Sequence, residues 1–144
     1  MKVIINIMAV LLIIFIGCEK VDLEKSKLDL LTEKIWVQDY EMLDTNKNNK
    51  PDDKKGLHKN ISFNFKVDGS LIYIKDEITK QLTWTFENNE TSIMVIGIMD
   101  DSIIPPVTEL SLSIFQLDEN NLIFYNTSTV NNPETGIFEI YKHL

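Results

Sequence analysis

The sequence predicts an all-β domain, an eight-stranded up-and-down antiparallel barrel with a short N-terminal helix. From Trp36 onward, apolar residues alternate with polar ones at the two-residue period of half-buried strands. Short turns rich in glycine, asparagine and aspartate separate these segments. Strands joined by short turns pair as neighbours, and closing the sheet into a barrel removes its exposed edges. A two-sheet β-sandwich is the alternative.

The chain begins with a segment that we expect to lie outside this domain. Lys2 precedes an apolar run from Val3 to Ile16 that only Asn6 interrupts. This run is shorter than the roughly 20 residues of a membrane-spanning helix. A positive start, a short apolar stretch and a small residue at its end are typical of a secretory signal. We therefore interpret residues 1–17 as a signal peptide.

The end of this segment, Phe15-Ile16-Gly17-Cys18, resembles the lipobox of bacterial lipoproteins, with Phe15 where leucine is usual. The resemblance implies cleavage before Cys18 and a diacylglycerol on its thiol. Cys18 is the only cysteine, so no internal disulfide can form, and lipidation removes a free thiol from an oxidising compartment. We expect a cell-envelope protein anchored by lipid, in the outer membrane, with the leaflet left open. A plain signal peptide or an uncleaved anchor is the alternative.

A polar tether and a short helix are expected before the strands. Residues 18–27 are polar and charged and are interpreted as the lipidated tether, and residues 28–144 as the β-barrel domain. Ser26 and Asp29 have the spacing of a capping box, which marks a helix start. Leu28, Leu31 and Ile35 then fall on one helical face, which we expect to pack on the β domain.

The alternation predicts eight strands in the rest of the chain. Their ranges are 35–43, 60–67, 70–76, 80–87, 92–99, 108–117, 121–127 and 136–142. Asp68-Gly69 is a strong hairpin turn, because glycine tolerates the positive φ that such a turn requires. The strand 92–99 is apolar on both faces, so we expect the helix or a neighbouring chain to cover its outer side.

These strands and turns resemble the lipocalin-like domains of bacterial lipoproteins. The matching segments are LTEKIW at 31–36, ISFNF at 61–65, DGS at 68–70, LTWTF at 82–86 and FEIYK at 138–142. The resemblance covers about residues 28–144, with Lys34 where lipocalins carry glycine. It implies an eight-stranded barrel, in some members with an apolar cavity, and it gives Trp36 a structural place at the closed end beside the helix.

Composition and motifs argue against several classes of function. The formal net charge is −8 and the chain has no arginine, which speaks against nucleic-acid binding. The two histidines, His58 and His143, lie in a loop and next to the C-terminus, and no nucleophile, phosphate-loop or His/Cys metal motif is present. We expect no enzyme activity, and we interpret most acidic residues as solvated charges in turns and on polar strand faces.

The barrel interior is the candidate ligand site, because eight strands enclose either a filled core or room for one small ligand. The candidate residues for a small apolar ligand are Phe63, Phe65, Trp84, Phe86 and Phe124. Gly97, which we expect opposite these residues, could leave space for a ligand. Their bulk instead favours a solid-core accessory protein that contacts another envelope protein through its loops or outer sheet face. The apolar loop IIPPV at 103–107 suits such a contact or a barrel rim.

A loop after the first strand resembles the start of a calcium-binding loop. The oxygen-bearing residues at its positions 1, 3, 5 and 9 are Asp44, Asn46, Asn48 and Asp52. Alternate side chains of a tight loop can converge on one hard cation. Asn49 occupies position 6, where αL geometry is needed, but Lys55 stands at position 12 in place of a carboxylate. The expectation is weak Ca²⁺ binding and no other cofactor; a solvated loop is the alternative.

Overall fold

A computed structural model describes residues 24–46, 48–54, 60–100, 107–126 and 136–144. The predicted signal peptide, Cys18, residues 18–23 of the tether and residues 103–106 of the apolar loop lie outside these ranges. The elements are α2 (Lys27–Thr32), β1 (Trp36–Asp44), β2 (Asp53–Lys54), β3 (Ile61–Phe65), β4 (Ser70–Lys75), β5 (Ile78–Glu87), β6 (Ser92–Asp100), β7 (Val107–Leu117), β8 (Asn121–Asn126) and β9 (Gly136–His143).

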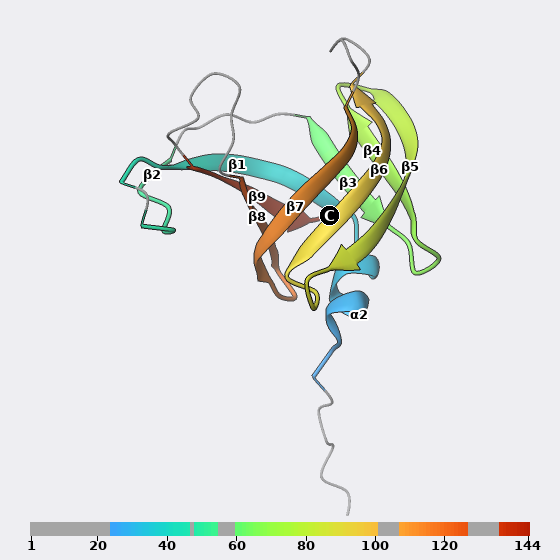
Figure 1. Ribbon diagram of the computed structural model, residues 1–144, viewed down its shortest axis with the longest axis horizontal. Helices are drawn as coiled ribbons and strands as arrows, with labels where there is room; N and C mark the ends of the chain where they lie inside the picture. Colours follow the sequence, from blue (N-terminus) through green and yellow to red (C-terminus); the bar gives the residue numbers. More distant parts are fainter. Residues whose placement is uncertain (1–23, 47, 55–59, 101–106, 127–135) are drawn as a thin grey trace, which may run out of the picture.

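The strands form one closed antiparallel barrel. Neighbours in the sheet follow the chain from β3 to β9, and β1 pairs with both β3 and β9. The β1–β9 pairing runs from Trp36↔His143 to Asp44↔Gly136, which confirms the predicted eight-stranded barrel and overturns the sandwich alternative. The extra strand β2 pairs only with the far end of β1, from which it projects in Figure 1. Two residues are too few for a strand to be predicted from periodicity.

The short helix closes one end of the barrel (Figure 1). The predicted capping box is confirmed, because the Ser26 hydroxyl accepts from the Asp29 N–H and the Asp29 carboxylate accepts from the Ser26 N–H. The helix contacts β3 and β7. It ends at Thr32, so Ile35 does not lie on its apolar face as predicted and is 38% exposed. Among the described residues, no helix has the length and hydropathy to cross a membrane.

Trp36 joins the helix to the barrel. Its indole Nε1 donates to the Leu31 carbonyl oxygen at 3.0 Å, and neither residue is exposed to solvent. This contact confirms the predicted place of Trp36 beside the helix at the closed end. The indole fills the base of the barrel while its one polar atom, which burial would otherwise penalise, is paired.

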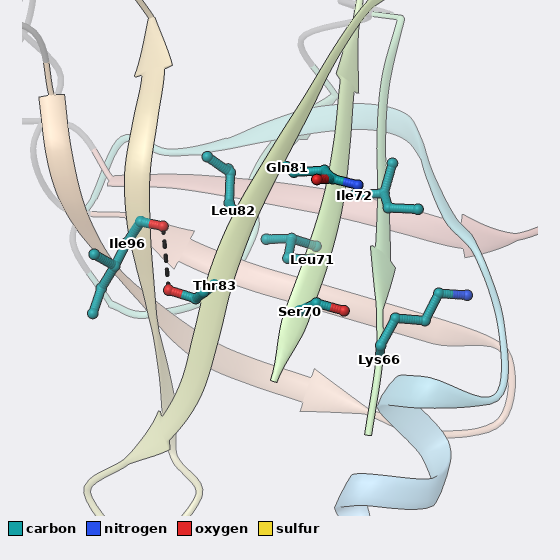
Figure 2. A pocket seen from close by; sticks show the side chains of 8 residues that line it. All are labelled: Lys66, Ser70, Leu71, Ile72, Gln81, Leu82, Thr83 and Ile96. Atoms are coloured by element: carbon teal, nitrogen blue, oxygen red, sulfur yellow. Dashed lines mark hydrogen bonds between the residues drawn. The ribbon is translucent and has the colours of Figure 1, made fainter. Parts of the chain in front are cut away.

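The outer face of β6 is not covered by the helix. Ile96 is 46% exposed, so that part of the expectation is wrong, and a neighbouring chain stays untested. A groove of about 410 Å³ crosses β4, β5 and β6 there (Figure 2). Its lining consists of Lys66, Ser70, Leu71, Ile72, Gln81, Leu82, Thr83 and Ile96. The groove combines two isoleucines and two leucines with polar side chains.

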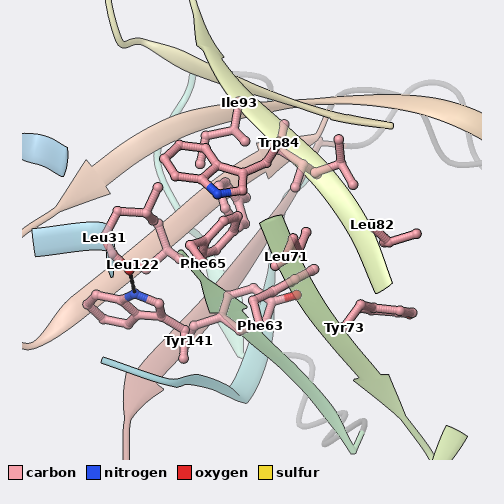
Figure 3. Packing of buried hydrophobic residues seen from close by; sticks show 14 residues of the cluster. Leu31, Phe63, Phe65, Leu71, Tyr73, Leu82, Trp84, Ile93, Leu122 and Tyr141 are labelled. Atoms are coloured by element: carbon pink, nitrogen blue, oxygen red, sulfur yellow. Dashed lines mark hydrogen bonds between the residues drawn. The ribbon is translucent and has the colours of Figure 1, made fainter. Parts of the chain in front are cut away.

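The barrel interior contains a cluster of buried, mostly apolar side chains (Figure 3). The buried cluster comprises Leu31, Trp36, Phe63, Phe65, Leu71, Tyr73, Leu82, Trp84, Ile93, Val95, Leu112, Leu122, Phe124 and Tyr141. The space expected beside Gly97 is filled, because a Cβ on this glycine would lie 2.6 Å from Leu82 Cδ2. Gly97 therefore permits close packing and opens no cavity at that point.

Asp118 stabilises the turn between β7 and β8. Its carboxylate accepts from the N–H groups of Asn120 and Asn121 at 2.8 and 2.9 Å, and from the Gln116 amide. The hydrogen bond from Gln116, with smaller contributions from Asn120 and Asn121, lowers the pKa of Asp118 from 3.8 to about 2. A group whose folded-state pKa is lowered contributes stability above its unfolded-state pKa.

We therefore expect Asp118→Ala to lower the free energy of unfolding by about 1 kcal/mol at neutral pH, a value discounted for partial solvation. This difference from the unsubstituted protein should shrink as the pH falls from 3.8 and be largely lost only below about pH 2, where Asp118 is protonated in the folded as well as in the unfolded state. Urea unfolding at several pH values measures it. A difference that stays constant down to pH 2 would contradict the assignment.

Candidate functional site: a polar cluster inside the barrel

Two polar side chains of β1 point into the barrel, Gln38 by regular alternation from Trp36 and Glu41 because of a β-bulge. The register with β9 shifts between Gln38 and Tyr40, so Gln38 lies opposite Tyr141 and Glu41 lies opposite Glu139. Directly opposed residues of neighbouring strands point to the same face of a sheet. Because Tyr141 belongs to the interior cluster, Gln38, Glu41 and Glu139 face the interior with it. Bulges re-aim side chains in this way near functional sites.

We call Gln38, Glu41, Tyr73, Glu139 and Tyr141 the interior polar cluster. Gln38 is 0% exposed and Glu41 is 1% exposed, and both tyrosines are buried. The Tyr141 hydroxyl donates to Glu139 Oε2 at 3.1 Å. Neither the Oε1 nor the Nε2 of Gln38 has a hydrogen-bond partner in the described part of the chain. Native proteins rarely leave buried amide atoms unpaired, so Gln38 indicates a missing partner such as water or a ligand.

The electrostatics of Tyr141 reflect its burial and its hydrogen bond to Glu139. Burial raises the pKa of Tyr141 well above 10.0, and the Glu139 carboxylate raises the pKa further by its charge and its hydrogen bond. Tyr73 and Glu41 act in the same direction. The phenol of Tyr141 therefore stays neutral and remains a hydrogen-bond donor at physiological pH.

Sequence reasoning missed this cluster for two reasons. Strict alternation from Trp36 would point Tyr40 inward, and only the bulge puts Glu41 there instead. In β9, both alternating sets contain apolar residues, so the pattern does not reveal which set faces the core. Phe138 and Ile140 face the outer side, where Phe138 contacts Phe115 and Tyr125 at ring-centroid distances of 4.8 and 4.6 Å. Glu41, which is buried, and Glu139, which is half-buried, therefore differ from the expectation of fully solvated charge.

The structure brings the five predicted ligand residues together. Phe63, Phe65, Trp84 and Phe124 are at most 7% exposed, and Phe86 packs against them. Their rings contact one another: Phe65 lies 5.3 Å from Trp84, and Trp84 lies 5.2 Å from Phe86. These rings form part of the packed core of the barrel. Phe63 and Phe124 reach the interior polar cluster, at 5.3 and 5.7 Å from Tyr141.

The predicted calcium loop is closed by its own hydrogen bonds. The Asp44 carboxylate accepts from the N–H groups of Asn48 and Asn49 at 3.0 and 2.9 Å and from the Tyr125 hydroxyl at 3.0 Å. Asp52 accepts from Thr45 and Asn46. The αL conformation expected at position 6 is confirmed by the φ of 58° at Asn49, while Lys55 lies outside the described residues. Among those residues, no three acidic, histidine or cysteine side chains gather to hold a metal.

A solved structure has the same architecture. It is the crystal structure of a lipocalin-like protein from Bacteroides uniformis ATCC 8492, which matches with a TM-score of 0.51 and 12% identity over 80% of this chain and 99% of that one. No family model matches this chain, and no curated protein sequence matches it. At this identity the likeness concerns the fold: the chain is a closed, lipocalin-like antiparallel barrel with one short helix.

Proposed function

We propose that this chain is a lipid-anchored envelope lipoprotein whose barrel binds one small ligand. The observation that carries the proposal is the interior polar cluster. Within it, both amide atoms of the buried Gln38 lack a partner among the described residues, and buried polar groups cost free energy unless they are paired. A barrel that served only as a solid support would place an apolar side chain at this position. The proposal includes no catalytic step and no contact with nucleic acid.

The ligand would occupy the interior on the side of the cluster away from α2. The helix and the aromatic packing close the other end, so entry from there would require unpacking Trp36, which is 0% exposed. Phe63 and Phe124, beside Tyr141, would form the apolar floor of this site. The ligand would therefore contact the aromatic rings of Phe63 and Phe124 on one side and polar side chains of β1 and β9 on another. This combination is typical of small-molecule sites.

The anchor is tested by Cys18→Ser in a bacterial host that processes lipoproteins. We expect the unsubstituted chain to incorporate radiolabelled palmitate and to sediment with membranes, and the variant to lose both properties. Two or more acyl chains bind a bilayer far more firmly than one, so the shift to the soluble fraction should be nearly complete. Unchanged labelling and sedimentation of the variant would refute lipidation at Cys18.

Ligand binding is tested by native mass spectrometry of the full chain extracted from the envelope in mild detergent. We expect a single adduct of small mass per chain that disappears on denaturation. A clean monomer without an adduct, together with capture of one envelope protein, would instead support the accessory-protein alternative. The half-exposed side chains of Ile96 and Phe115 on the outside of the barrel favour that second function.

Weak calcium binding at the loop of Asp44, Asn46, Asn48 and Asp52 is a separate proposal. It is favoured by the αL conformation of Asn49 and by the N–H groups that already orient Asp44. We expect a calorimetric response only at millimolar Ca²⁺, because the loop's own donors compete for its oxygens. The response should be lost in Asp52→Asn and kept in Glu109→Gln, which removes an exposed acid elsewhere. No heat at millimolar Ca²⁺ would refute the site.

A further inference from the structure

We infer that the interior polar cluster binds the protonated amine of its ligand. This inference rests on the proposed ligand-binding function and names the class of ligand. Its first observation is the geometry of β1 and β9: Glu41 and Glu139 are register partners that face the interior. An ammonium placed between two opposed carboxylates interacts favourably with both, and its charge-assisted hydrogen bonds are stronger than neutral ones.

Gln38 supplies the second, independent observation. Its side chain is fully buried, lies on the same face as Glu41 and opposite Tyr141, and has two amide atoms without partners in the described residues. The amide oxygen can accept from an N–H of the ligand, and the amide nitrogen can donate to an acceptor group. A bound amine carries three donors, so it can bond to this oxygen as well as to the carboxylates.

The two tyrosines restrict what the site accepts. Because the pKa of Tyr141 is raised by burial and by Glu139, the phenol remains a donor and keeps one Glu139 oxygen engaged at 3.1 Å. This bond fixes the orientation of the Glu139 carboxylate. The ring of Tyr73 lies 5.4 Å from that of Phe63, which places an aromatic wall beside the polar groups.

Two lysines also lie on the interior face, on other strands of the barrel. Lys80 is the register partner of Tyr73, and Lys75 lies two residues after Tyr73 on the same face. Lys75 belongs to β4 and Lys80 belongs to β5, whereas the carboxylates of Glu41 and Glu139 belong to β1 and β9. The carboxylates and the lysines therefore belong to different walls of the barrel interior.

The test is calorimetric titration of the full chain in detergent with three probes of matched size: n-butylamine, 1-butanol and butyrate. We expect butylamine to bind and to raise the melting temperature, and the alcohol and the carboxylate to bind at least about tenfold more weakly. Glu139→Gln should weaken butylamine binding by about tenfold or more, and Glu41→Gln is the second variant if the first does not fold. Glu109→Gln removes the same charge from the exposed outer face and should leave binding unchanged.

Equal binding of butylamine and butanol, or stronger binding of butyrate, would overturn this inference. If butylamine fails while the envelope-extracted protein carries a different small adduct, the proposed function stands and the ligand class is wrong. If the extracted protein carries no adduct and no probe binds, both fail. Binding that Glu139→Gln and Glu41→Gln leave intact would place the amine elsewhere, and ordered water alone would then account for Gln38.

Discussion

Replacing Trp36 with alanine is expected to lower the free energy of unfolding by about 3–5 kcal/mol, the range for truncation of a large buried aromatic residue. Trp36 is 0% exposed and is the largest fully buried side chain among the described residues. Its removal leaves a cavity at the base of the barrel and leaves the Leu31 carbonyl without its 3.0 Å donor. The expected consequence is detachment of α2, because Trp36 links this helix to the strands. Urea unfolding measures the loss.

Two further variants separate the contribution of Trp36 packing to the free energy of unfolding from the contribution of its Nε1 hydrogen bond. Trp36→Phe keeps most of the apolar surface and removes the Nε1 donor, so we expect a smaller loss of about 1–2 kcal/mol. Val67→Ala changes a side chain that is 72% exposed and should alter stability by less than about 0.5 kcal/mol. If Trp36→Ala costs no more than Val67→Ala, the helix is not held by this residue and the closed end is misassigned.

Replacing Gln38 with methionine is expected to raise the free energy of unfolding by about 1–3 kcal/mol in the absence of ligand. Each buried polar atom left without a partner costs about this much, and methionine has a similar shape without the amide. Both amide atoms of Gln38 lack partners in the described residues, so the substitution removes this penalty without breaking a hydrogen bond to any of those residues. The same variant should bind butylamine more weakly, which would make Gln38 a residue kept for function at the expense of stability.

Gln81→Met provides the matched control, because Gln81 is exposed on β5 and its substitution should change stability by no more than about 0.5 kcal/mol. A loss of stability in Gln38→Met would show that the amide is paired, for example by ordered water inside the barrel. Thermal melting without butylamine shows whether Gln38→Met gains or loses stability. Melting with butylamine shows how well the variant binds it, because a ligand that binds only the folded state raises the melting temperature.

Much of the fold was predictable from local pattern. The alternation of Ile61, Phe63 and Phe65 and the Asp68-Gly69 turn gave a strand and a hairpin whose bounds agree closely with β3 and β4. Ser26 and Asp29 gave the helix start. These signals are local, because a half-buried strand shows period two and a capped helix shows its cap within a few residues.

The candidate site was not predictable in the same way. The five aromatic residues chosen from alternation lie in the core, but Gln38, Glu41 and Glu139 were not among the candidates. Gln38 follows the alternation from Trp36, but the inward direction of Glu41 depends on one extra residue in β1, and that of Glu139 on the pairing of β9 with β1 across the closure. A bulge reverses the face of every residue beyond it, and no local pattern in residues 36–44 marks where it falls.

By itself, the sequence determined that this protein is an all-β barrel with a capped helix and a tryptophan at its base, because these features follow from local periodicity and capping chemistry. Only the tertiary structure decided that β1 pairs with β9 and that Glu41 faces Glu139 inside the barrel. It also decided that Gln38 is buried without a partner among the described residues. Strand partners and register depend on residues about 100 positions apart in the chain, and the free energy of such contacts is set by burial, which single-sequence patterns do not encode.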